Sequence, residues 1–419
     1  MLVQEPETIN QKPETVVAAP AAPVKPARLV SLDVYRGFVM VLMASEGLYL
    51  YRCVRDPSLK DSAFWQFLAH QSDHVLWSGC VLWDLIQPSF MFMVGVAMPF
   101  SLASRRAKGD SFSSMLLHAI GRSLILIVLA LIVSTDNGAR MTNFIFTNVL
   151  AQIGISYTFL FLLAWTKPRT QIIAACGLLL AHWAAFALYP LPPAEFDYST
   201  VIGKIYGNPK WEPLTGFAAH WNKNTNLNWA FDQWFMPLFP REKPWTFNTG
   251  GYGTLNCVCS LVTMIFGLLA GQFLRTGGEA MKKFWSFIVA GLIGLTVGSI
   301  LDYTGICPSI KRLWTPSWAI FSTGWTCLML ASFYFVIDIK GYQRWAMPLL
   351  VVGMNSIAMY MMAHLWPPFF RDFFRTHFGP DVFKICGEAF EPAVGAAMVL
   401  AVMWAICWWM YRRKLFLRI

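Results

Sequence analysis

The chain has 419 residues, of which 56% are hydrophobic and only 13% are charged. Soluble globular proteins carry about 25% charged residues, so this composition excludes a soluble fold and predicts a chain that lies mostly in lipid. The net charge is +10, but the basic residues form no stripe with interleaved stacking aromatics. We therefore expect no nucleic acid as a partner.

Residues 1–28 are rich in Pro, Ala, Val and Glu, and they contain no apolar run before a small-residue cleavage site. This composition predicts a disordered cytoplasmic tail and no cleaved signal peptide. Residues 29–419 are expected to form one transmembrane domain.

Ten apolar windows follow, each near the length of about 20 residues that spans a hydrocarbon core of about 30 Å. They lie at residues 32–52, 75–104, 114–134, 146–165, 170–190, 252–274, 283–301, 313–338, 345–365 and 392–411. We expect an all-α, polytopic membrane protein with about ten transmembrane helices. Lys and Arg are concentrated in the short loops of one side, and this positive-inside bias places both termini in the cytoplasm.

Asp84 lies in the second apolar window, ten residues after His74. A carboxylate at the centre of a transmembrane helix costs about 2.5–3.5 kcal/mol on insertion scales, so its presence indicates a function. Histidine exchanges protons near neutral pH, and the two residues form a candidate catalytic pair. On one continuous helix they would stand about 15 Å apart, so a direct contact requires an unwound segment from 74 to about 80. The alternatives are a structural ion pair for Asp84 and an interfacial position without a role for His74.

Other polar side chains also fall within or beside the apolar windows. They are Asp33, Arg36, Glu46, Arg122, Gln152, Asn256, Asn355 and His364. Asp33 and Arg36 are three residues apart on one helical face, which predicts an ion pair between them. Asn355 is equally well explained as a hydrogen-bonding group between helices.

The segment 191–251 is the longest one expected to lack helices, and it should lie on the outer side. It is dense in Trp, Asn and Pro. Such long loops are usually functional or disordered, and flat aromatic faces beside amides suit a sugar-binding surface. An aromatic belt that rests on the membrane interface explains the composition equally well.

Several motifs in chain order have a familiar pattern. They are residues 28–37 (RLVSLDVYRG), the run from His74 through Trp77, Gly79 and Asp84 to Gly95, and residues 149–154, 253–256, 311–317 and 353–357. Together these motifs resemble the heparan-α-glucosaminide N-acetyltransferase family. Its bacterial members are catalogued as domains of unknown function within the transmembrane acyltransferase superfamily. The chain departs from the family pattern at residues 43–47, where bacterial relatives carry asparagines.

The resemblance implies an enzyme that takes acetyl from cytoplasmic acetyl-CoA and delivers it to an amino sugar or glycan on the outer side. The family's active histidine falls on His74, which is either transiently acetylated or acts as a general base, and Asp84 would orient it. The expected substrate-binding residues are Glu46, Trp77, Asn256, Asn355 and His364. The expected cofactor-binding residues, for the CoA phosphates, are Arg105, Arg106 and Lys108. No metal is expected.

Two further questions stay open at this point. A proton-coupled transporter or flippase of a sugar or small anion would suit ten spans with intramembrane titratable groups, and O-acetylation of a glycan competes with N-acetylation. We expect a multi-pass protein of the bacterial inner membrane, in contact with membrane lipids. A homodimer is left open.

Overall fold

The computed structural model describes residues 29–135, 138–202 and 211–417, so the predicted tail 1–28 lies outside the described residues. Every regular element within these ranges is helical, which confirms the all-α class. Seven of the described helices are long and apolar enough to cross a membrane. They are α4 (Ile86–Arg106), α5 (Phe112–Val133), α7 (Pro168–Leu188), α10 (Asn256–Arg275), α11 (Ala280–Tyr303), α12 (Pro316–Phe333) and α16 (Glu391–Arg412).

An eighth span arises if α13 (Met347–Met354) and α14 (Ser356–Leu365), which meet at a bend of 71°, cross together. The two remaining apolar windows form α1 (Val30–Ala44) and α6 (Val149–Leu163). Each of these has 15 residues, which is about 22 Å of helix and shorter than the hydrocarbon core. Every predicted window therefore contains a helix, while the number of about ten spans stays a prediction.

The first window is broken because the backbone turns left-handed after α1. Glu46, Leu48 and Tyr49 have φ values of 48°, 51° and 48°. Left-handed backbone at residues other than glycine is uncommon, and it ends the helix before the four-residue helix α2 (Leu50–Cys53).

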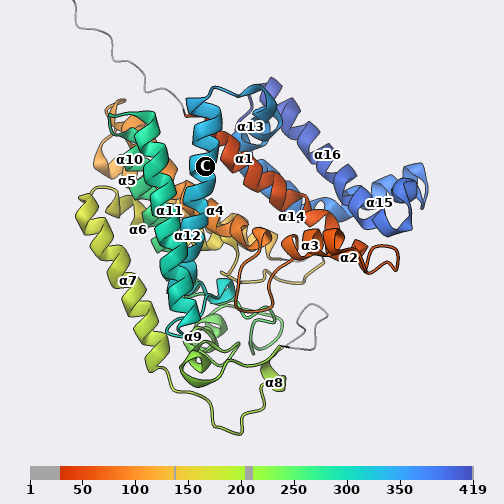
Figure 1. The fold of residues 1–419 in the computed structure, drawn as a ribbon, viewed down its shortest axis with the longest axis horizontal. Coiled ribbons are helices and arrows are strands. Elements are labelled where there is room, and N and C mark those ends of the chain that lie inside the picture. The colour runs from red at the N-terminus through yellow and green to blue at the C-terminus, as the bar shows by residue number, and fades with distance from the viewer. Residues whose placement is uncertain (1–28, 136–137, 203–210, 418–419) are drawn as a thin grey trace, which may run out of the picture.

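The spanning helices pack in pairs, α4 along α10, α11 along α12, α5 along α6 and α1 along α13. Figure 1 shows the long helices running side by side, with α15 (Pro367–Phe378) projecting from the bundle. Glycines permit the closest contacts. A Cβ on Gly95 of α4 would lie 2.0 Å from the Met264 carbonyl oxygen of α10. Small residues at such crossings are the usual solution in membranes, where close backbone approach drives helix association.

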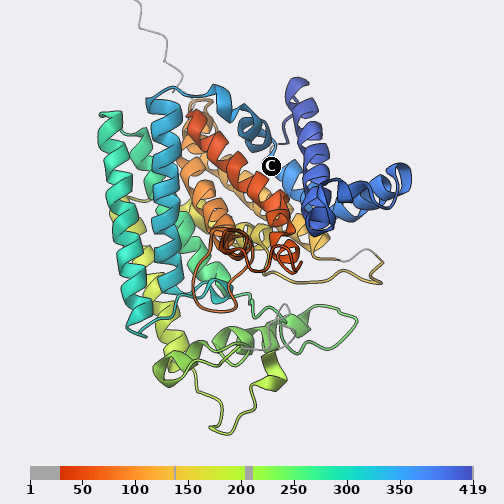
Figure 2. The same ribbon diagram turned by 45° about the vertical axis from the view of Figure 1, so that its right-hand side comes forward.

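The segment 191–251 lies at the opposite end of the bundle from the start of α1 and the end of α16 (Figure 2). It is less irregular than expected, because it contains α8 (Ser199–Ile202) and α9 (Leu227–Phe235). Its amides are buried and bind the protein's own backbone. The Asn222 side chain accepts the Leu214 N–H and donates to the Leu214 carbonyl. Asn224 donates to the Val201 carbonyl, and Asn226 accepts a backbone N–H at the start of α9. These asparagines therefore stabilise the segment, and they are not presented on its surface as a sugar platform would require.

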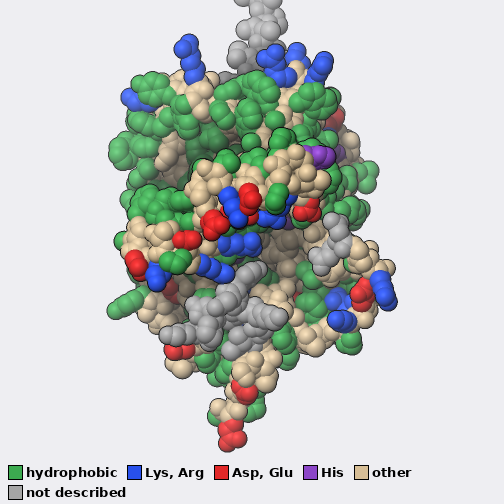
Figure 3. Space-filling view, turned by 90° about the vertical axis from the view of Figure 1, so that its right-hand side faces the viewer, with side chains coloured by type: hydrophobic (Ala, Val, Ile, Leu, Met, Phe, Trp, Pro, Cys, Tyr) green, Lys and Arg blue, Asp and Glu red, His purple; other side chains and the backbone are tan. Residues whose placement is uncertain are grey.

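The face that carries α15 separates into zones in Figure 3. Hydrophobic side chains form a band below a group of Lys and Arg at the top, and mixed charges cross the middle of the face. Two ion pairs join α15 to neighbouring parts of the chain, that of Arg371 with Glu46 and that of Arg375 with Glu391. A hydrophobic band bounded by charges on both sides is the surface expected of a protein that spans a bilayer.

Candidate active site

His74 and Asp84 contact each other directly, because most of the chain between them is not helical. Such an unwound segment was expected from the sequence. No residue from 72 to 81 is helical, and a 3-10 turn, Leu82–Leu85, leads into α4. The Nδ1 atom of His74 lies 2.7 Å from Oδ1 of Asp84. The chain thus folds back, and two residues that are ten positions apart form a direct hydrogen bond.

A third residue, Lys311, completes the cluster. Its Nζ lies 3.1 Å from Oδ1 of Asp84 and 3.2 Å from Nδ1 of His74. Lys311 begins the 3-10 turn Lys311–Leu313, between α11 and α12. Trp314 follows in left-handed conformation, fully buried, and its indole N–H donates to Thr263 of α10. The buried Trp314 thus fixes the position of the turn that places Lys311 beside Asp84, just before α4.

Asp84 is enclosed, with 1% of its side chain exposed. While Oδ1 receives the imidazole and the ammonium, Oδ2 lies 3.4 Å from the backbone nitrogens of both Val75 and Val81. A buried charge is tolerated only when it is paired and hydrogen-bonded. The ammonium and these donors together satisfy that condition.

The geometry also assigns the proton on His74. An ionised carboxylate only accepts hydrogen bonds, so Nδ1 must carry the hydrogen that bridges to Asp84. Nε2 then keeps its lone pair, and it makes no hydrogen bond to any residue that the structure describes. The side chain is 30% exposed. Burial and the nearby cations Lys311 and Arg312 lower the pKa of His74 below its ordinary value, although Asp84 opposes them. His74 is therefore a neutral imidazole with one accessible nitrogen.

Arg312 connects this cluster to the outer segment. Its guanidinium donates to the Gly250 carbonyl at 2.8 Å and to the Val75 carbonyl at 3.4 Å. It also lies 5.5 Å from the centre of the Tyr252 ring. The residues that follow the outer segment are thus fastened to the chain that carries His74.

A cavity of about 550 Å³ opens between α1, α4, α5, α6 and α14. Its polar lining includes four cationic and two acidic side chains, together with a histidine. They are Arg36, Arg105, Lys108, Arg122, Asp33, Asp110 and His118. Arg105 pairs with Asp110 at 3.2 Å. The predicted Asp33–Arg36 ion pair is confirmed, at 3.3 Å.

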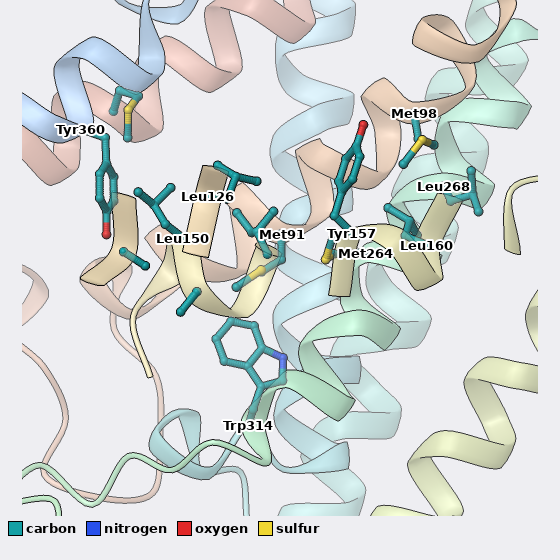
Figure 4. Close-up of a cluster of buried hydrophobic side chains, with 14 of the residues drawn as sticks. Met91, Met98, Leu126, Leu150, Tyr157, Leu160, Met264, Leu268, Trp314 and Tyr360 are labelled. Atoms are coloured by element: carbon teal, nitrogen blue, oxygen red, sulfur yellow. The ribbon is translucent and has the colours of Figure 1, made fainter. Parts of the chain in front are cut away.

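The cavity follows α4 inward from its basic mouth. The lining includes Arg105 at one end and Phe90 at the other, which are about 22 Å apart along the helix. Phe90 is six residues after Asp84, about 9 Å on the helix axis. Figure 4 shows part of the apolar wall, where Met98, Leu126, Leu150, Tyr157 and Tyr360 gather from several helices.

Arg122 of α5 is another basic residue of this lining. Its Nη1 donates to the Tyr157 hydroxyl at 3.2 Å, and the guanidinium lies 4.6 Å from the centre of that ring. Its Nε is buried without a hydrogen-bond partner among the described residues. A buried donor left unmet indicates a site that an acceptor group would complete.

The three predicted CoA-binding residues divide in the structure. Arg105 and Lys108 line the cavity, whereas Arg106 is not among its lining residues and stacks on Trp165, with 4.0 Å between the guanidinium carbon and the ring centre. Their assignment to CoA stays a prediction. The unassigned cations Arg36 and Arg122 share the lining, and only helix packing brings them there.

The predicted substrate-binding residues do not form one group. Trp77 is buried, and its indole N–H donates to the Trp221 carbonyl, so it holds the outer segment in place. Asn256 is fully buried, receives a hydrogen bond from Asn228 and donates to the Arg312 carbonyl. Both residues support the chain around His74 and Lys311.

The other three lie along α14 and near it. His364 stacks on Tyr360, with ring centres 4.1 Å apart, and Glu46 pairs with Arg371 at 3.2 Å. Asn355 is buried at the bend between α13 and α14, where its Oδ1 lies 3.4 Å from the backbone nitrogen of Leu417. Their binding roles stay predictions.

Lys311 is the functional candidate that sequence reasoning missed. It stands inside the motif at residues 311–317, but nothing in that motif names its partners. No three His, Cys, Asp or Glu side chains converge in a metal-binding arrangement within the described ranges.

Known proteins resemble this chain over most of its length. No family model matches it. The human and the mouse heparan-alpha-glucosaminide N-acetyltransferases are each 24% identical to it, over 94% of this chain. The chain spans 60% of the length of those relatives. The similarity thus extends over nearly the whole chain, and it confirms the predicted resemblance of this chain to the heparan-alpha-glucosaminide N-acetyltransferase family.

Proposed function

We propose that this protein transfers acetyl from acetyl-CoA, bound in the inner cavity, to an amino group of a sugar or glycan that approaches from the outer side. The observation that carries the proposal is the arrangement along α4. A cavity with a basic mouth follows this helix toward its first turn, where the imidazole of His74 presents a free nitrogen.

The donor fits the cavity by chemistry. CoA carries phosphates and a long flexible arm, and the cavity offers cations at its mouth and apolar walls beyond them. Arg36, Arg105 and Lys108 would bind the phosphates, since charge-assisted hydrogen bonds to such anions are the strong ones. The arm would extend between the helices and bring the thioester toward the start of α4.

Two routes use the same imidazole. In the direct route the acceptor amine attacks the thioester carbon while Nε2 of His74 takes the amine proton. The carbon–sulfur bond breaks, and the departing thiolate takes that proton from the imidazolium. In the covalent route Nε2 attacks the thioester carbon first, the carbon–sulfur bond breaks and the thiolate leaves. The amine then displaces the imidazole from the acetyl group, and the amine proton passes to the released Nε2 and from there to the thiolate. Both routes require His74 to be neutral at the start.

The test uses inside-out membrane vesicles that enclose glucosamine, with labelled acetyl-CoA added outside. We expect labelled N-acetylglucosamine in the lumen, and at least a 100-fold loss of product in His74→Ala, which is the order of magnitude of a lost general base. His70→Ala is the matched control, because His70 is an exposed histidine on α3 (Ala63–Gln71). Substantial transfer by His74→Ala would reject the role of His74. Movement of unmodified glucosamine without acetylation would favour a carrier.

A further inference from the structure

Lys311 is buried at a position where a lone ammonium would be costly. Only 6% of its side chain is exposed. Its ammonium lies within hydrogen-bond distance of Oδ1 of Asp84 and Nδ1 of His74. A buried lysine is retained only where a carboxylate or several acceptors compensate it. Lys311 therefore belongs to the His74–Asp84 pair and not to the general packing of the bundle.

The contact with His74 cannot be an ordinary hydrogen bond. Nδ1 already carries the hydrogen that it gives to Asp84, and an ammonium has no acceptor to offer. At 3.2 Å the two groups interact electrostatically, and the interaction becomes repulsive when the imidazole gains a positive charge. An isolated carboxylate at this position would have the opposite effect, because it would stabilise the imidazolium.

We propose that Lys311 is a positioning residue that balances the charge of Asp84, so that the carboxylate orients His74 without converting it into a stable imidazolium. Asp84 and Lys311 together carry no net charge, which leaves Nε2 basic and nucleophilic. Any cation formed on the ring during transfer is opposed by the ammonium and passes its proton or acetyl group on. This role rests on the proposed function only for its activity readout.

The other charged groups around His74 support the same direction. Arg312 approaches from the same turn as Lys311 and lowers the pKa of His74 further. Asp73 is bonded to the backbone of His74, since its Oδ1 accepts the His74 N–H at 2.8 Å. Trp83 is the aromatic neighbour, with ring centres 6.4 Å apart. Among the residues that the structure describes, Asp84 is thus the carboxylate that contacts the ring.

The experiment measures the charge state of His74 without any substrate. Purified protein in detergent is treated with diethyl pyrocarbonate, which reacts with neutral imidazole, and the modified His74 peptide is quantified by mass spectrometry between pH 4 and 9. The wild-type midpoint should lie below the ordinary histidine value of about 6.5. In Lys311→Met the midpoint should rise by about one pH unit or more, because a charge within about 4–6 Å is removed. Lys311→Arg should stay near the wild type.

The matched control is Lys283→Met. Lys283 is also buried, but its ammonium donates to the Leu274 and Thr276 carbonyls at the C-terminal end of α10, and it has no contact with the His74 cluster among the described residues. The substitution Lys283→Met should leave the pH midpoint of His74 labelling unchanged. An unchanged midpoint in Lys311→Met would overturn the proposal.

A second pair of variants applies if Lys311→Met does not fold. Asp84→Asn is then compared with the double variant Asp84→Asn, Lys311→Met, which removes both charges together. The midpoint should be higher in the double variant, and equal midpoints would overturn the proposal.

Activity separates this inference from the proposed function. In Lys311→Met the acidic limb of kcat/KM for acetyl transfer should move to higher pH with the labelling midpoint. If His74→Ala keeps its activity, the proposed function fails while the labelling still tests Lys311. If His74→Ala is inactive and the labelling midpoint is the same in Lys311→Met and the wild type, this inference alone fails.

Discussion

The two ends of α4 meet opposite kinds of charge distribution. At the outer end, Asp84 and Lys311 compensate each other around a neutral imidazole. Toward the C-terminal end, the cavity lining carries four cations and two acids, and Arg36 and Arg105 pair with these acids. A cluster without net charge suits a group that must change charge during a reaction, whereas an excess of cations suits a permanent anion. This difference is what the proposed function expects of a reactive site at one end of the helix and a donor-binding site at the other.

The strongest way to break this comparison is to remove the outer carboxylate. Asp84→Asn leaves Lys311 uncompensated beside His74 and lets the ring rotate. We expect kcat for acetyl transfer to fall by about 10²–10⁴-fold, the range for disabling an acid–base group. The KM for acetyl-CoA should change little, because the donor cavity is lined by other residues. A variant with near wild-type kcat would mean that the outer cluster is structural.

Removing inner cations should produce the reverse pattern. Arg105→Gln or Arg122→Gln should each raise the KM for acetyl-CoA by about tenfold, since a charge-assisted hydrogen bond is worth about 1.5–3 kcal/mol, and kcat should be kept. Initial rates over a range of donor concentrations measure both constants. Arg106→Gln is the comparison, because Arg106 stacks on Trp165 away from the lining and its KM should rise less. An equal rise of the KM in all three variants would mean that these cations attract acetyl-CoA only at long range and do not contact it.

A smaller effect should appear in the outer segment, which has its own buried acid. Asp232 of α9 accepts the Thr254 N–H, and burial raises its pKa to about 6. An unfolded aspartate has a pKa of about 3.9, so the folded state binds more protons between these values. Stability should therefore fall as pH rises from about 4 to about 6, and stay lower above it, by at most about 3 kcal/mol.

Asp232→Asn keeps the shape and the acceptor oxygen but cannot ionise. Its unfolding temperature in detergent should change less between pH 5 and pH 7 than that of the wild type. The same pH dependence in both proteins would show that Asp232 is not the titrating group.

Much of the fold was readable from the order of the residues. Each apolar window contains a helix, and the unwound approach to Asp84 followed from the demand that His74 reach it. The sequence left the role of the asparagines in segment 191–251 open, because it does not show whether an amide faces a ligand or the protein's own backbone. Lys311 was missed because 227 residues separate it from Asp84.

The amino-acid sequence by itself indicated that the protein lies in a membrane, where its helices are, and which two residues form a candidate reactive pair. Hydrocarbon provides no partners for backbone hydrogen bonds, so the chain must form helices, and a charge in hydrocarbon is costly, so that its presence indicates a function. Only the tertiary structure decided which charges meet. Side chains of α1, α4 and α5 become one basic cavity, and a turn after α11 delivers the cation that balances Asp84. Packing between helices sets these distances, and electrostatic energy depends on distance and burial, which the sequence alone does not specify.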